Sequence, residues 1–163
     1  MMEPICLELI GILEEQKEKY RQLIDLSVQK QQYLINGALA DLNETTRQEE
    51  SLVFQLGKLE GQREKCFARL AELGGFAENC TLKEVLPQLP QDSQKQLRQI
   101  QEDFAELMHD LTRLNKENMS LLEQSLRFVH FTVESISQHS KPLYNAEKEV
   151  KVEQLNNILD KKV

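Results

Sequence analysis

The sequence contains no Trp, and aromatic residues make up only 6% of its 163 residues. Gly and Pro, the residues that interrupt helices, occur only six and four times. A β-sandwich or an α/β enzyme would need more turn residues and more aromatic strand residues than this composition supplies. Glu, Gln, Lys and Leu are abundant instead, as is typical of long helices. We therefore expect an all-α fold.

The chain also lacks an excess of basic residues and long hydrophobic runs. Its 27 acidic and 20 basic residues give a formal net charge of −7, which argues against a nucleic acid or an anionic membrane surface as partner. No stretch approaches the roughly 20 apolar residues that a membrane span requires. The N-terminus has no basic region typical of a signal peptide, and glutamates interrupt its apolar residues. These features predict a cytoplasmic protein without membrane insertion.

Residues that would carry chemistry are scarce. The three cysteines, Cys6, Cys66 and Cys80, are far apart and show no metal-binding spacing, so we expect free thiols. Glu106 and His109 form one E-x-x-H pattern, but a di-iron bundle needs two such patterns and two further glutamates. No glycine-rich phosphate loop or nucleophile elbow occurs. We expect no metal, no cofactor and no catalytic residue, and therefore not an enzyme.

Three segments repeat apolar residues in alternating steps of three and four, which places them on one stripe of a helix. The first stripe comprises Leu9, Leu13, Gln16, Tyr20, Leu23, Ser27, Lys30 and Leu34. The second comprises Leu52, Leu56, Leu59, Arg63, Cys66, Leu70 and Leu73. The third comprises Leu97, Ile100, Phe104, Leu107, Leu111, Leu114, Asn118, Leu121, Ser125, Phe128 and Thr132, and continues past Ile136. The spacing predicts an elongated antiparallel bundle of three long coiled-coil-like helices.

Local signals mark the ends of these helices. Asn36-Gly37 marks either a chain reversal or a kink in one long helix, and we favour the reversal. Gly74-Gly75 predicts a left-handed C-cap after the second helix. Thr81 and Glu84 read as a capping box that opens a short connecting helix, and Ser93 with Gln96 as a second box that opens the third long helix. Pro142 ends that helix, because proline removes a backbone hydrogen bond and clashes with the preceding turn.

Polar residues interrupt the stripes, among them Gln16, Lys30, Arg63, Asn118 and Ser125. Such residues most often fix helix register at some cost in stability, and we assign this role to Asn118 and its neighbour Asn115. Gly57 and Gly61 form a G-x-x-x-G on the outward face of the second helix. They are either tolerated surface glycines or a place where a partner or a second copy lies close. A homodimer is therefore left open.

Pro142 divides the chain into a bundle domain, residues 1–142, and a C-terminal tail, residues 143–163. The tail carries Tyr144 and a thin apolar stripe formed by Val152, Leu155, Ile158 and Leu159. Isolated helices of this length are marginal in water, so we expect the tail to be largely disordered alone and to become helical on a partner. A short fourth helix packed on the bundle and a frayed end are the alternatives.

Several local patterns, in this order, resemble the FlgN family of flagellar export chaperones. In the second helix the resemblance lies in Glu49 and Glu50, followed by Leu52 through Leu59-Glu60 to Arg63. A stronger likeness follows in the third helix, where Leu111-x-x-Leu114-Asn115-Lys116-Glu117-Asn118-Met119-Ser120-Leu121-Leu122 is similar to the family's N-x-x-N-x-x-L-L stretch. The resemblance extends over most of the chain, from Leu9 to Tyr144.

The resemblance implies a cytosolic chaperone that binds flagellar hook–filament junction proteins, prevents their premature assembly and delivers them to the type III export gate. It implies cargo binding by the C-terminal part, which we place on Val152, Leu155, Ile158 and Leu159. It also implies docking to the export gate through a tyrosine beyond the last bundle helix, here Tyr144. The alternative is a structural coiled-coil protein, a tether or scaffold without an export role.

Overall fold

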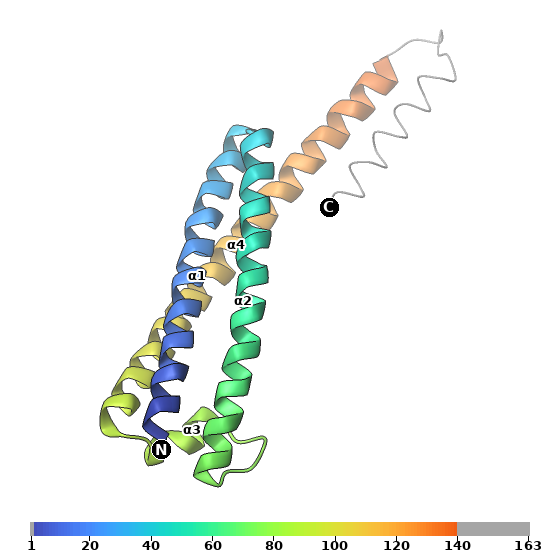
Figure 1. The fold of residues 1–163 in the computed structure, drawn as a ribbon. Helices are drawn as coiled ribbons and strands as arrows, with labels where there is room; N and C mark the ends of the chain where they lie inside the picture. Colours follow the sequence, from blue (N-terminus) through green and yellow to red (C-terminus); the bar gives the residue numbers. More distant parts are fainter. Residues whose placement is uncertain (1, 140–163) are drawn as a thin grey trace. The chain divides into compact units, whose positions relative to one another are not determined.

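The computed structural model describes residues 2–139, and these form an all-α fold (Figure 1). Three long helices are present, α1 (Met2–Asn36), α2 (Leu39–Gly74) and α4 (Gln91–His139). Helix α3 (Leu82–Val85) and the 3-10 turn η1 (Leu86–Gln88) connect α2 to α4. The boundary between two compact units lies within α4, after Lys116. The predicted helix count and order are confirmed for the described part of the chain.

The chain reverses between α1 and α2 at the predicted position. Gly37 adopts a φ of 68°, in the left-handed region where a Cβ is disfavoured. The amide of Ala38 then donates a hydrogen bond of 3.0 Å to the carbonyl of Tyr33, which uses one of the free carbonyls at the end of α1. The two helices therefore run antiparallel and side by side in the first unit, as Figure 1 shows.

The predicted cap of α2 is also present. Gly75 has a φ of 71°, and its amide donates to the carbonyl of Glu72 at 3.1 Å. The amide of Phe76 donates to the carbonyl of Ala71 at 2.9 Å, which completes a Schellman motif. The capping box before α3 is confirmed as well, because the amide of Thr81 donates to Oε2 of Glu84 at 2.6 Å.

The predicted start of α4 is wrong. The helix begins at Gln91, so Ser93 lies inside its first turn and is buried instead of capping it. Pro90 takes the capping position, since its carbonyl accepts a 2.9 Å hydrogen bond from the amide of Gln94. Proline has no amide hydrogen and a fixed φ, which makes it a suitable residue at the start of a helix.

The tightest packing in the first unit joins all its elements. Seven residues from α1, α2, η1 and α4 form this cluster with Val85 of α3 and Leu89, all at most 8% exposed: Ile5, Cys6, Leu9, Cys66, Leu70, Leu86 and Leu97. A second, smaller cluster along the α1–α2 pair contains Leu23, Leu26, Leu52 and Leu56. Burying a leucine side chain contributes about 1.5–3 kcal/mol, so the first cluster is the main source of stability in this unit.

None of the described helices combines the length and the apolar composition that crossing a bilayer would require. This finding concerns residues 2–139 only.

Gly57 and Gly61 of α2 face open space, because a Cβ built on either would meet no atom within 4 Å. We therefore expect Gly57→Ala and Gly61→Ala each to raise the free energy of unfolding by up to about 1 kcal/mol through helix propensity alone. Chemical denaturation of the purified variants measures this effect. A loss of stability, or a change in the molecular mass in solution, would instead indicate that a second copy lies against this face.

Candidate functional site

The last turns of α4 expose large apolar side chains. Phe128, Phe131 and Ile136 are 69%, 68% and 66% exposed, respectively. Together with Thr132, Ser135 and His139 they line one shallow apolar hollow. The spacing of these residues puts them on one side of the helix. We call Phe128, Phe131 and Ile136 the α4 face.

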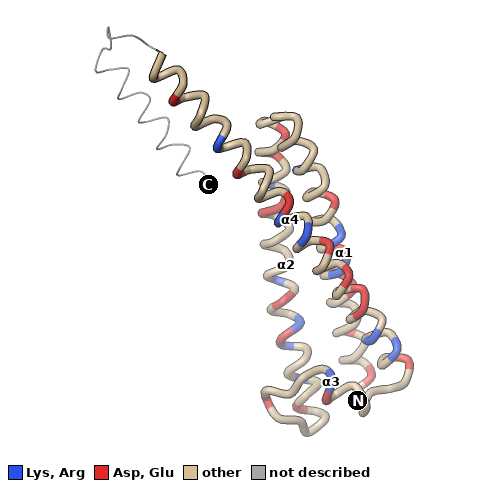
Figure 2. The backbone as a smooth tube through the Cα atoms, turned by 180° about the vertical axis from the view of Figure 1, so that it is seen from behind, with Lys and Arg blue, Asp and Glu red and all other residues tan. Residues whose placement is uncertain are grey.

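Few charges accompany the α4 face. From Leu121 to His139, the Asp, Glu, Lys and Arg residues are limited to Glu123, Arg127 and Glu134. Figure 2 shows the same contrast, because the last part of α4 is mostly tan whereas the preceding helices carry many red and blue segments. An apolar face with so few charges costs free energy in water and is typical of a surface that binds another apolar surface.

The α4 face continues the stripe that packs the first unit. Leu97, Ile100 and Leu114 are at most 4% exposed, and Asn118 is 5% exposed. Beyond Leu121 the same steps of three and four lead to exposed residues. The stripe is therefore exposed at Ser125, Phe128, Thr132 and Ile136. The pattern is unchanged there, but no described residue covers it.

The predicted cargo and docking residues lie beyond this face. Tyr144, Val152, Leu155, Ile158 and Leu159 are outside the described residues, so their roles stay predictions. The same holds for the predicted division into residues 1–142 and 143–163. The structure therefore adds an exposed apolar surface that the sequence interpretation had not identified.

The two asparagines predicted to fix register differ in their environment. Asn118 is 5% exposed, whereas Asn115 faces solvent. A buried polar side chain restricts which neighbours a helix accepts, which agrees with the role expected of Asn118. The register role of both residues stays a prediction.

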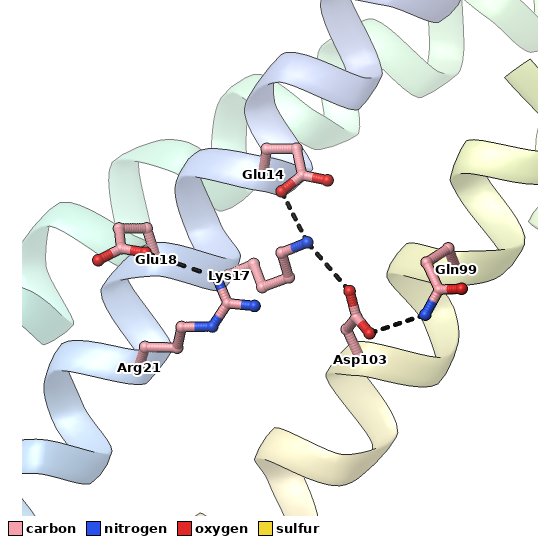
Figure 3. Close-up of polar contacts among 6 residues, drawn as sticks. All are labelled: Glu14, Lys17, Glu18, Arg21, Gln99 and Asp103. Atoms are coloured by element: carbon pink, nitrogen blue, oxygen red, sulfur yellow. Dashed lines mark hydrogen bonds and ion pairs between the residues drawn. The ribbon is translucent and has the colours of Figure 1, made fainter.

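A polar layer joins α1 to α4 in the middle of the first unit. The Nζ of Lys17 lies 3.0 Å from Oδ2 of Asp103 and 2.7 Å from Oε2 of Glu14 (Figure 3). The amide of Gln99 donates to Oδ1 of Asp103 at 3.0 Å. Only 7% of Lys17 is exposed, and a buried charge is tolerated when it is paired on both sides.

A second group of polar contacts joins α1 to α2. Nε2 of Gln16 donates to Oε2 of Glu60 at 3.0 Å, and the same carboxylate accepts two hydrogen bonds from Arg63 at 2.6 and 2.8 Å. Lys30 pairs with Glu49 across the helices at 3.0 Å. The polar residues predicted within the stripes, Gln16, Lys30 and Arg63, are thus matched by partners, as a role in register requires.

These contacts lower the pKa of two carboxyl groups, those of Glu60 and Asp103. The pKa of Glu60 lies below its ordinary value of 4.5, first because Arg63 donates hydrogen bonds to it and then because Gln16 does. The pKa of Asp103 lies below 3.8, through hydrogen bonds from Gln99 and then from Lys17. The pKa of Lys17 is raised above 10.5, chiefly by its hydrogen bond with Glu14.

Within residues 2–139, the side chains that could bind a metal or act as a nucleophile do not lie together in one site. Glu106 and His109 are both exposed, and residues 2–139 contain no cluster of three or more His, Cys, Asp or Glu placed to hold a metal ion. Cys6 and Cys66 are buried, and burial raises the pKa of both thiols. A raised pKa lowers the fraction of reactive thiolate, so these cysteines serve as core residues.

Two features of this region were missed by reading the sequence. The ion pair between Lys17 and Asp103 lies beside the expected stripes. The only related signal in the sequence is Glu14, which lies three residues before Lys17 and pairs with it on the same helix. Phe131 was not assigned to any stripe, although it lies three residues after Phe128 and therefore near it on the helix.

The acid side of the stability profile should depend on the polar layer. A carboxyl group whose pKa is lowered by folding stabilises the fold above its unfolded pKa, and this contribution is lost as the pH falls through the folded value. We expect Glu60→Gln and Asp103→Asn to lower the melting temperature by a few degrees at neutral pH and to flatten its decline below pH 4.5. Circular dichroism melts measure this. Glu102→Gln, at an exposed site on α4, is the control. Variants as stable as the parent would show that the layer contributes nothing.

The chain was compared with known proteins in three ways. No curated protein and no solved structure matched the chain. A family model described as FlgN protein matches residues 2–162, nearly the whole length. The chain therefore belongs to the FlgN family, a family of flagellar export chaperones.

Proposed function

We propose that this protein is a cytosolic type III export chaperone that binds hook–filament junction proteins of the flagellum. It keeps them from assembling prematurely and delivers them to the export gate. Family membership supports the general role, and the exposed α4 face is the observation that carries the binding function.

The chemistry of the α4 face suits a helical partner. Phe128 and Phe131 project from neighbouring positions of one helix and are both about two-thirds exposed. Aromatic side chains contribute strongly to interfaces because each buries a large apolar area with few rotatable bonds. A junction subunit that polymerises through helical ends needs its apolar stripe covered until export. The α4 face can cover such a stripe by helix-to-helix packing.

The C-terminal tail completes the proposed site. In this proposal Val152, Leu155, Ile158 and Leu159 contact the cargo helix, and Tyr144 docks to the export gate. Their order along the chain separates the two tasks, because Tyr144 lies two residues after Pro142 whereas the apolar stripe lies further on. One segment can then hold cargo while its beginning meets the export apparatus.

The proposed role requires binding and release but no reaction. The protein would act as a binding partner without catalytic residues or a cofactor, and release would be left to the export machinery. The acidic composition, with a net charge of −7, fits a protein partner better than a nucleic acid. A structural tether or scaffold is the competing function, and it would not require the α4 face to engage a flagellar subunit.

The α4 face should be needed for cargo binding. Phe128→Asp combined with Phe131→Asp places two charges on it. We expect affinity for a purified junction protein to fall on the order of thirtyfold or more, since central aromatic contacts are typically worth about 2 kcal/mol or more. Isothermal titration calorimetry measures the affinity.

A matched control is available on α2, where Phe54 is 65% exposed. Phe54→Asp adds a similar charge at a similarly exposed phenylalanine and should leave cargo affinity unchanged. Equal losses in both variants would show that the effect is not specific to α4. No binding by the parent protein to any junction subunit would favour the tether.

The tail should separate cargo binding from gate docking. A chain ending at Tyr144 should melt at nearly the same temperature as the parent, because the main core cluster lies entirely before Lys116, but it should lose cargo binding. Tyr144→Ala should retain cargo binding and reduce secretion of the junction proteins in a strain that lacks the native gene. If the shortened chain unfolds, the tail is a core element and the proposed division of tasks is wrong.

A further inference from the structure

We infer that a charged edge beside the α4 face fixes the direction and the register in which a cargo helix binds. We call Glu123, Arg127 and Glu134 the α4 edge. The partner that complements it is an amphipathic helix whose apolar stripe is bordered by a basic, an acidic and a second basic residue. This inference rests on the proposed function, because it names the chemistry of the cargo that the α4 face would bind.

The α4 edge lies on one side of the helix. Arg127 comes four residues after Glu123, and Glu134 comes seven residues after Arg127. Steps of four and seven residues return to nearly the same side of a helix, so the three side chains form one row. They are the only Asp, Glu, Lys or Arg residues between Leu121 and His139. The charges of these four residue types are therefore gathered on one side of the segment.

The α4 edge borders the α4 face along Phe131. That residue lies four positions after Arg127 and three positions before Glu134, which makes all three neighbours on the helix surface. Ser125 and Val129 lie on the opposite border of the face, and neither carries a charge. A partner that packs on the face therefore meets charged side chains along one border only.

The three charges of the α4 edge are available to a partner. Each of the residues is exposed, and none belongs to an ion pair within residues 2–139. Charges beside an apolar stripe determine which helices pair and in which orientation, as the e and g positions of coiled coils do. The complementary cargo helix carries a basic residue opposite each glutamate and an acidic residue opposite Arg127.

The unequal spacing gives the α4 edge a direction. Glu123 and Arg127 are about 6 Å apart along the helix axis, whereas Arg127 and Glu134 are about 10 Å apart, at 1.5 Å per residue. A cargo helix parallel to α4 needs its acidic residue four positions after its first basic residue, and an antiparallel one needs it seven positions after. A cargo helix with one of these spacings places its acidic residue about 4.5 Å away from Arg127 when it binds in the other direction. Each complementary sequence therefore fits in one direction.

Designed peptides test the α4 edge. Two amphipathic helical peptides of identical composition share one leucine stripe and carry Lys, Glu and Lys along one border. In one peptide the Glu lies four positions after the first Lys, and in the other it lies seven positions after. We expect the full chain to bind one peptide on the order of fivefold more tightly, because one surface ion pair changes affinity by up to about this factor. Fluorescence anisotropy of labelled peptides measures both affinities, and the tighter peptide identifies the direction of binding.

Exchanging two charges of the α4 edge provides the decisive variant. Arg127→Glu with Glu134→Arg keeps the net charge of the protein and should remove the preference between the peptides. Arg98→Glu with Glu102→Arg makes the same exchange at two exposed positions of α4 outside the α4 face, and it should keep the preference. Equal binding of both peptides by the parent, or a preference that survives the exchange in the α4 edge, would overturn the inference.

The outcomes separate this inference from the proposed function. If the parent binds a purified junction protein but neither peptide, or both peptides equally, the chaperone proposal stands and the inference is wrong. If the parent distinguishes the peptides but binds no junction protein, the α4 edge recognises helices and the proposed cargo is wrong. If the variant with Phe128→Asp and Phe131→Asp still binds the peptides, they do not occupy the α4 face and the inference is wrong. A change in the molecular mass of the free protein when the edge charges are exchanged would show that a second copy occupies the face, and this too would overturn the inference.

Discussion

Burial of one narrow apolar stripe on each long helix is the constraint on which the first unit depends. Where the stripes converge, Cys6, Leu70, Val85 and Leu97 are at most 1% exposed. This cluster ties both ends of the α2–α4 connection to the start of α1, so that the loop, α3 and η1 have little freedom. Removing Leu70 would leave a cavity among four elements, a change that typically costs 2–5 kcal/mol.

Away from the cluster the stripes are interrupted, and polar pairs then determine how the helices align. Lys17 is nearly buried, yet it meets carboxylates from its own helix and from α4. A shift of α1 by one turn would separate Lys17 from Asp103 and would leave only Glu14 of its own helix to pair with the buried charge, which is costly. Apolar contacts alone would tolerate such a shift, because heptad stripes repeat themselves. The polar layer therefore selects one register from several that are similarly apolar.

Much of this fold could be predicted from the sequence because its signals are local. The steps of three and four located all three long helices, and glycines at 37 and 75 marked reversals that their positive φ angles confirm. The Thr81–Glu84 box was found for the same reason. The start of α4 was misplaced, since Ser93 and Gln96 imitate a cap that Pro90 provides. The end of burial on α4 could not be read at all. Phe104 and Phe128 lie on the same stripe, and only packing by other helices separates the half-buried residue from the exposed one.

The continuation of one apolar stripe from the buried to the exposed part of α4 bears on function. In the proposed function, the exposed part of α4 presents to cargo the same kind of surface that the helix uses to fold. Recognition of a helical cargo then needs no specialised pocket, because ridges and grooves of leucine and phenylalanine fit many amphipathic helices. Such a surface is also a hazard, since it fits other copies of itself equally well. In the proposed function, cargo covers this surface, so that binding also removes the hazard.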